Sequence, residues 1–204
     1  MIAVLAAAAL AASGSAVREE AFAEDATPRE ILAACRQMVP EDVKIDGHVN
    51  RRSRHGTQVA AYTYSLVRKD GSTEISFKDA DGKDVPFEKH GRLLDTDIMW
   101  SDLAMDFLWW EDVSFAGGGN GEDSVHGISC RTLLLRKGNR EYKAWIDRRT
   151  GALLQAHELR DGRTVREIFC TSLKKFGERW APRNLEVGSP GARYRTKIVI
   201  ENIE

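Results

Sequence analysis

The densest group of side chains able to do chemistry lies in Leu94–Phe115. Carboxylates recur through this stretch, as metal binding or acid–base catalysis would require. They are Asp95, Asp97, Asp102, Asp106, Glu111 and Asp112. No histidine or cysteine lies among them, whereas three of the five tryptophans do. The aromatic content instead predicts a short amphipathic helix laid over a large apolar surface.

The remaining histidines form no catalytic or metal-binding motif. They are scattered, at His48, His55, His90, His126 and His157. None has the spacing HxxxH, HxH or HExxH, and no GxSxG nucleophile motif is present. We therefore expect no metal, no cofactor and no catalytic residue. One alternative stays open, because His48 and His157 fall on predicted strands and could each approach a carboxylate in space.

The cysteines are expected to be plain buried thiols. Three of them, Cys35, Cys130 and Cys170, leave one unpaired even if a disulfide forms, and their spacing fits neither zinc nor a CxxC motif. Leu32–Cys35 spells a lipobox, but the charged Arg29 and Glu30 interrupt the apolar run that lipidation needs.

Residues Thr27–Val39 predict a helix instead, with Thr27 as N-cap, Pro28 in the first position and Glu30 in the third.

Two loops carry misleading patterns. Asp79–Asp84 superficially resembles a calcium loop but lacks the EF-hand ligand order, so it predicts a turn. Gly117–Gly121 is followed by a strand and not by a helix, which indicates a flexible loop on which the aromatic segment Leu94–Phe115 moves, not a phosphate cradle.

Composition places the chain among single-domain globular proteins. It has 204 residues, 42% of them hydrophobic, with a formal net charge of -1. Without the first 23 residues the chain carries 29 basic and 29 acidic residues. Nucleic-acid binding is not expected, because it requires a basic excess or stripe.

The N-terminal residues are typical of an export signal. Ile2–Ala12 is an apolar run of the length of a signal-peptide core and too short to span a bilayer. Cleavage sites of the small-x-small type follow at Gly14–Ala16 and Ala21–Ala23. We favour cleavage after Ala23, which gives a signal peptide of residues 1–23 and one domain of residues 24–204. An N-terminal helix of the mature protein is the alternative.

Most of the chain predicts antiparallel strands. Alternating or β-rich segments separated by turn residues are found at Val43–Val49, Val59–Val67, Thr73–Phe77, Gly127–Gly138, Tyr142–Asp147, Ala152–Arg160, Thr164–Phe176, Ala181–Val187 and Tyr194–Ile203. A second short helix is predicted at Ser101–Leu108, with Ser101 as its cap. The fold class is therefore mainly β (α+β), a curved antiparallel sheet or half-open barrel with helices on its concave face.

Three segments resemble the LolA-like family, in particular its outer membrane lipoprotein-sorting subgroup. Asp97–Leu103 looks like the subgroup's "DF-aromatic-x-DL" signature. Tyr142–Asp147 with Thr150-Gly151 resembles its W-x-D…TG strand and turn, and Trp180–Arg183 resembles a further recurring element. The resemblance implies a half-open β-barrel whose cavity holds acyl chains.

This resemblance implies a periplasmic carrier that binds acyl chains of lipoproteins or lipids, with an inner-membrane exporter and an outer-membrane acceptor as further expected partners. An RseB-like sensor or protein-interaction module is the alternative. The expected cavity or lid residues are Trp100, Leu103, Met105, Phe107, Trp109, Trp110, Ile31 and Leu32. They share large apolar side chains on the two predicted helices or in the segment next to them.

Overall fold

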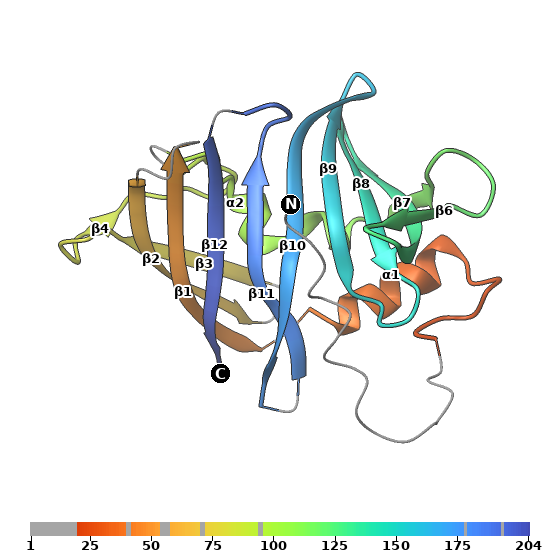
Figure 1. Ribbon diagram of the computed structural model, residues 1–204, viewed down its shortest axis with the longest axis horizontal. Coiled ribbons are helices and arrows are strands. Elements are labelled where there is room, and N and C mark those ends of the chain that lie inside the picture. The colour runs from red at the N-terminus through yellow and green to blue at the C-terminus, as the bar shows by residue number, and fades with distance from the viewer. Residues whose placement is uncertain are drawn as a thin grey trace.

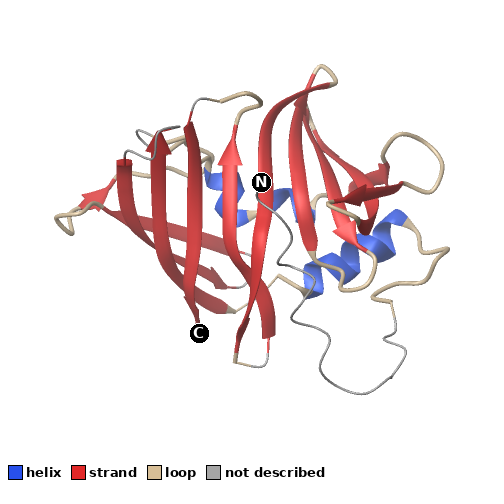
Figure 2. Ribbon diagram, viewed as in Figure 1, coloured by secondary structure: helices blue, strands red, loops and turns tan. Residues whose placement is uncertain are grey.

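The computed structural model describes residues 20–39, 42–53, 58–69, 72–93, 96–177, 179–192 and 194–204. Its helices are α1 (Pro28–Gln37), α2 (Trp100–Ala104) and the 3-10 helix η2 (Asp106–Trp109). The strands are β1 (Val43–Ser53), β2 (Gln58–Lys69), β3 (Ser72–Lys78), β4 (Asp84–Val85), β5 (Asp112–Phe115), β6 (Glu122–Val125), β7 (Ile128–Lys137), β8 (Arg140–Asp147), β9 (Leu153–Arg160), β10 (Arg163–Phe176), β11 (Arg179–Gly188) and β12 (Tyr194–Ile203). Figures 1 and 2 show strands dominating the molecule.

All twelve strands of the described residues belong to one antiparallel sheet, in the order β4-β3-β2-β1-β12-β11-β10-β9-β8-β7-β5, with β6 also paired to β7. The first long strand, β1, pairs with the last strand, β12, so the two ends of the domain meet in the middle of the sheet. The sheet twists and curves without closing, and α2 lies behind β11 and β12 in Figure 1. The predicted fold class is confirmed.

Strand β1 shows why these segments form a curved sheet with one buried face. Val43, Ile45, Gly47 and Val49 are buried, whereas the residues between them are at least partly exposed. This period of two places one set of side chains on the core. Gly47 sits at a register shift, and a Cβ atom there would lie 2.0 Å from the carbonyl oxygen of Val199. Only glycine allows the two strands to approach so closely.

Helix α1 begins as its sequence predicts. The Thr27 Oγ1 accepts a hydrogen bond from the Glu30 backbone N–H, and the Glu30 carboxylate accepts one from the Thr27 N–H at 2.7 Å. This reciprocal capping box satisfies two N–H groups that the helix leaves free. Ile31, Leu32 and Cys35 form the buried face of the helix.

The predicted helix Ser101–Leu108 is wrong in its bounds and its cap. Helix α2 starts at Trp100 with Met99 as N-cap, and it ends at Ala104, because the next residue, Met105, has a left-handed φ of 50°. The chain then continues as η2. The Asp102 carboxylate accepts the Met99 N–H at 2.7 Å, so it caps the helix in place of Ser101. Residues 96–110, which include both short helices, form the covering segment.

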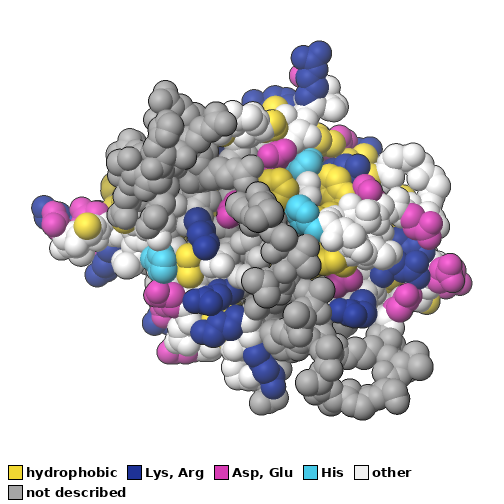
Figure 3. Space-filling view, in the orientation of Figure 1, with side chains coloured by type: hydrophobic (Ala, Val, Ile, Leu, Met, Phe, Trp, Pro, Cys, Tyr) yellow, Lys and Arg dark blue, Asp and Glu magenta, His cyan; other side chains and the backbone are white. Residues whose placement is uncertain are grey.

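The two faces of the sheet carry separate apolar clusters. The larger one lies between the sheet, α1 and the covering segment, and it includes Leu133 and Leu135. A small second cluster on the opposite face contains Cys130 and Trp145. Leu133 and Leu135 therefore point away from Cys130, as the alternation of side chains along a strand requires. Charged side chains are spread over the face seen in Figure 3, with hydrophobic and histidine side chains gathered near β8 and β9.

The turn predicted at Asp79–Asp84 is confirmed. It connects β3 to β4, which begins at Asp84, and Asp79 accepts hydrogen bonds from the backbone of Asp81 and Lys83. The turn residues His55-Gly56 and Asp70-Gly71, which by their types predict two further turns, lie outside the described residues. Within the part of the chain that the structure describes, no helix has the length and apolarity needed to cross a membrane.

Residues before α1 pack onto the domain. The Phe22 side chain is only 8% exposed and belongs to the main core. The Ala21 N–H donates to the carbonyl oxygen of Arg148 at 3.1 Å, and the Glu20 carboxylate pairs with the Arg148 guanidinium at 2.8 Å. The segment just before α1 is therefore part of the folded unit.

Changing Phe22 to Ala tests this packing. We expect the free energy of unfolding to fall by about 3 kcal/mol, the usual cost of removing a buried aromatic ring. Urea unfolding followed by circular dichroism measures it. Val67→Ala is the matched control, because Val67 is 40% exposed, and its cost should stay below about 1 kcal/mol. Equal effects of the two changes would contradict the core role of Phe22.

Candidate functional site

An apolar cavity lies beneath α1 and the covering segment. It contains about 740 Å³ of space between atoms, part of it open to solvent. Its wall combines the end of α1, the covering segment and six strands. The lining residues are Cys35, Met38, Val39, Ile45, Tyr64, Leu66, Arg68, Leu103, Met105, Ala152, Leu153, Cys170, Ala181, Pro182, Leu185, Ile200 and Ile203. Such a wall offers apolar contact with very few polar groups, which suits a hydrocarbon ligand.

Only two of the eight predicted cavity residues line this space. Leu103 and Met105 form its cover. Ile31, Leu32 and Phe107 are almost fully buried in the main core beside it. Whether any of these side chains contacts a ligand stays a prediction.

The three tryptophans of the segment have different surroundings. Trp110 is 3% exposed and meets the Tyr142 ring edge-on, with 5.6 Å between the centroids. Trp109 is half-buried, and the Arg68 guanidinium lies 5.3 Å from its ring centroid. Trp100 packs edge-on against His90 at 5.1 Å. These rings fix the covering segment to its surroundings and do not point together into the cavity.

Arginines from two separate elements hold the backbone of the covering segment. Arg36 of α1 donates from Nε to the carbonyl oxygen of Leu108 at 2.6 Å. Arg68 of β2 donates from Nη2 to the carbonyl oxygen of Ala104 at 3.0 Å. Both carbonyls lie near ends of the short helices, where backbone acceptors lack intrahelical partners. The cover is therefore attached by polar contacts as well as by apolar packing.

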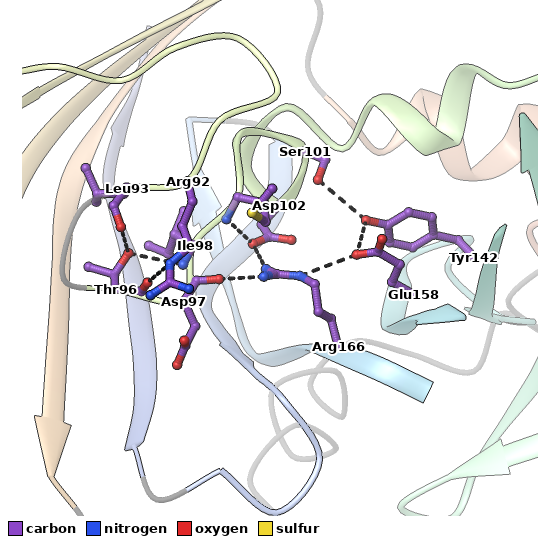
Figure 4. Close-up of polar contacts among 11 residues, drawn as sticks. Arg92, Leu93, Thr96, Asp97, Ile98, Ser101, Asp102, Tyr142, Glu158 and Arg166 are labelled. Carbon is purple, nitrogen blue, oxygen red and sulfur yellow. Dashed lines mark hydrogen bonds and ion pairs between the residues drawn. The ribbon is translucent and has the colours of Figure 1, made fainter. Parts of the chain in front are cut away.

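A third arginine reaches the segment from β10 in a polar network (Figure 4). The Arg166 guanidinium forms an ion pair with the Asp102 carboxylate and donates to the Asp97 carbonyl oxygen at 2.7 Å. Its Nε lies 3.5 Å from a Glu158 carboxylate oxygen. The Tyr142 hydroxyl is within 3.4 Å of Glu158 and 3.5 Å of the Ser101 hydroxyl. One network thus joins α2 to β8, β9 and β10.

Asp102 is the most perturbed carboxyl of this network. It is completely buried, and the loss of hydration raises its pKa to about 7, although the Arg166 charge acts in the opposite direction. Burial likewise raises the pKa of the Tyr142 hydroxyl to about 12. The Asp102 carboxyl therefore holds its proton to a higher pH than an ordinary aspartate does.

Two cavity-lining thiols, Cys35 and Cys170, are expected to react slowly in this environment. Burial raises the pKa of each to about 12, which leaves little of the reactive thiolate at neutral pH. The three cysteines are free. Cys35 lies in the middle of α1 with its side chain wholly buried.

Both histidines singled out from the sequence approach carboxylates. His48 Nδ1 lies 2.9 Å from Glu201, which is exposed, and His157 Nε2 lies 3.9 Å from Glu167. Neither histidine lines the apolar cavity. Across the described ranges, no group of three or more His, Cys, Asp or Glu side chains is arranged to hold a metal ion.

Sequence reasoning missed most of the cavity wall and every arginine that holds the cover. The wall residues come from strands that meet only in the folded sheet, so their spacing along the chain carries no signal. The motif Asp97–Leu103 contains Asp102, but an aspartate on an amphipathic helix is expected on the exposed, polar face. The burial of Asp102 could therefore not be predicted. In the Tyr142–Asp147 motif, Asp147 accepts hydrogen bonds from the Arg149 backbone and the Thr150 hydroxyl, which shapes the turn.

Comparisons with known proteins agree with this architecture. No protein-family model matches the chain, and no curated protein matches it in sequence. The fold is similar to a LolA superfamily protein from Nitrosomonas europaea (TM-score 0.67, 9% identity, covering 88% of this chain and 93% of that one). It is also similar to a DUF1329 family protein from Desulfovibrio piger ATCC 29098 (0.65, 15%, 88% and 93%).

A third similar structure is a putative outer membrane lipoprotein-sorting protein domain from Vibrio parahaemolyticus (TM-score 0.65, 8% identity, covering 86% of this chain and 90% of that one). The chain therefore has a LolA-like fold, as the sequence resemblance predicted. At these identities the likeness concerns the fold.

Tyr142 offers a test of what holds the cover in place. Its ring stacks on Phe107 with centroids 4.4 Å apart and planes at 7°, while its hydroxyl belongs to the polar network. We expect Tyr142→Phe to lower the free energy of unfolding by about 1 kcal/mol, through the lost hydrogen bonds. Tyr142→Ala should cost about 3–5 kcal/mol, through the lost ring. Urea unfolding of both variants separates the two contributions, and equal costs would show that ring stacking contributes little.

Proposed function

We propose that this protein is a periplasmic carrier that binds acyl chains of lipoproteins or lipids in the apolar cavity. The cavity is the observation that carries the proposal, because its wall is almost wholly apolar and its cover is a separate segment. The LolA-like fold supports the same conclusion. An inner-membrane donor and an outer-membrane acceptor are the partners that this role requires.

The cavity needs no catalytic chemistry to serve this function. Each methylene moved from water into an apolar site contributes about 0.8 kcal/mol, so a single long chain can be retained by burial alone. Leu103 and Met105 form part of the wall and belong to the covering segment. Displacing that segment would enlarge the entrance, and we propose that ligand enters by this route. We accordingly assign a binding role and no enzymatic one.

Protection of Cys170 provides the direct test. Cys170 lines the cavity, whereas Cys130 lies in the cluster on the opposite face of the sheet. Palmitate, or a synthetic diacylglyceryl peptide, is expected to slow N-ethylmaleimide labelling of Cys170 severalfold and leave Cys130 unaffected. Peptide mass spectrometry resolves the two sites. Equal slowing at both would indicate general stabilisation, and no slowing at either would contradict acyl binding in the cavity.

The natural cargo can be sought in the same protein. Organic extracts of material purified from periplasm without detergent should contain stoichiometric acyl species, identified by mass spectrometry. A protein that is empty and also fails the labelling test would favour an RseB-like interaction module.

We further propose that the export signal is cleaved before residue 20. The buried Phe22 and the Glu20–Arg148 ion pair support the earlier site, after Ala16, over the site after Ala23. Mass spectrometry of the mature N-terminus is expected to find Val17 first. A mature chain that starts at Glu24 would contradict this assignment and require the domain to be stable without Phe22.

A further inference from the structure

The carboxyl group of Asp102 is built into the joint between the covering segment and the sheet. It lies in the first turn of α2, where it accepts the Met99 N–H at 2.7 Å. Its Oδ2 contacts the Arg166 guanidinium, and its Oδ1 is buried with no hydrogen-bond partner among the described residues. A buried carboxylate oxygen without a partner is costly when charged. Protonation of Asp102 would remove that charge, and Glu158, 3.5 Å from the Arg166 Nε, would remain as the anion paired with the guanidinium.

Charged groups surround Asp102 from every strand that the network reaches. Arg166 projects from β10, Glu158 from β9 and Arg140 from β8, and the last of these also lies 3.5 Å from Asp106 of η2. The Glu158 charge favours protonation of Asp102, and the two arginines oppose it. Tyr142 and Ser101 complete the network as neutral groups. The buried Asp102 carboxyl is therefore surrounded by charges that it would not meet in water.

We propose that Asp102 and Arg166 form a proton-operated latch, which holds the covering segment over the cavity when Asp102 is protonated and loosens it when Asp102 is ionised. The latch rests on the proposed function only for the identity of the ligand, because acyl chains would enter the cavity when the covering segment loosens. Opening and closing of the segment are proposed for the protein without ligand.

The direction follows from the two surroundings of the carboxyl. In the closed segment its pKa is raised to about 7 by burial, whereas its ordinary value is 3.8. The closed state therefore binds the proton more tightly than an open, hydrated state. Closure is favoured as the pH falls through 7, and the gain ends once the open state is protonated as well. Between about pH 8 and about pH 5.5, the opening equilibrium should fall roughly thirtyfold.

Other charges touch the segment and could add their own pH dependence. His90 packs on the Trp100 ring, and Lys89 lies 5.6 Å from the same ring centroid. Asp97 offers a matched comparison, because only its backbone oxygen contacts Arg166. Figure 4 shows the Asp97 carboxylate pointing away from that guanidinium. The two aspartates thus share a segment and differ in their contact with the latch.

Hydrogen–deuterium exchange of ligand-free protein tests the latch. Protection of peptides within residues 96–110, corrected for the intrinsic effect of pH on exchange, should rise roughly thirtyfold from about pH 8 to about pH 5.5. Asp102→Asn should abolish this dependence and keep the segment protected at both values. Asp97→Asn should behave as the unchanged protein does. Peptides from β7 and β8 serve as the internal reference for folding.

Failure has a distinct signature. Protection of the segment that is independent of pH in the unchanged protein, or pH-dependent protection that survives Asp102→Asn, would overturn the latch. If Asp102→Asn does not fold, Arg166→Gln replaces it: loss of the opposing cation should move the rise in protection to higher pH, and an unmoved rise counts against the latch. Because no ligand is present, this result is independent of the Cys170 labelling that tests acyl binding.

Discussion

A curved antiparallel sheet with an apolar concave face must be covered, and that requirement governs the rest of this molecule. Strands contribute alternate residues to the concave side, as the buried positions of β1 show. Water has to be displaced from that surface, because its exposure would cost about 25 cal/mol for each Å² of apolar area. Helix α1 and the short α2–η2 segment supply the cover. They do not fill the concave side completely, and the space that they leave is the cavity.

The cover is attached by two kinds of contact. Phe107, Leu108 and Trp110 are buried in the main core, which gives most of the segment apolar anchorage. Arginines from α1, β2 and β10 hold its backbone and its single buried carboxylate. Hydrogen bonds and ion pairs in a low-dielectric interior are strong when every polar group has a partner, and a polar group left without one is costly. This second kind of contact makes the cover sensitive to a single proton.

The sequence was sufficient for the fold class and for most strands, because alternation and turn residues are local signals. The capping box of α1 could likewise be predicted from Thr27 and Glu30. The covering segment was harder, because the left-handed Met105 divides it and no glycine marks that position. The site was harder still. Leu103 and Met105 were identified by residue type, whereas Leu153, Leu185 and Ile200 become neighbours only through the order of the strands. Arg166 and Asp102 are 64 residues apart, so the order of residues along the chain does not indicate that they pair.

The pairing of β1 with β12 constrains how the chain can fold. Ile45 lies opposite Ile203, so the centre of the sheet cannot form until β12 is available. Contacts of such long sequence separation slow folding, because the loop between them must be ordered first. The hairpins from β7 to β10 are local and can assemble earlier, whereas β1 to β3 must wait for β12 to join them to that half. Until β12 has been made, the edge of β1 that pairs with it has no neighbour, so the two halves of the sheet stay unjoined while the β7–β10 hairpins are already complete.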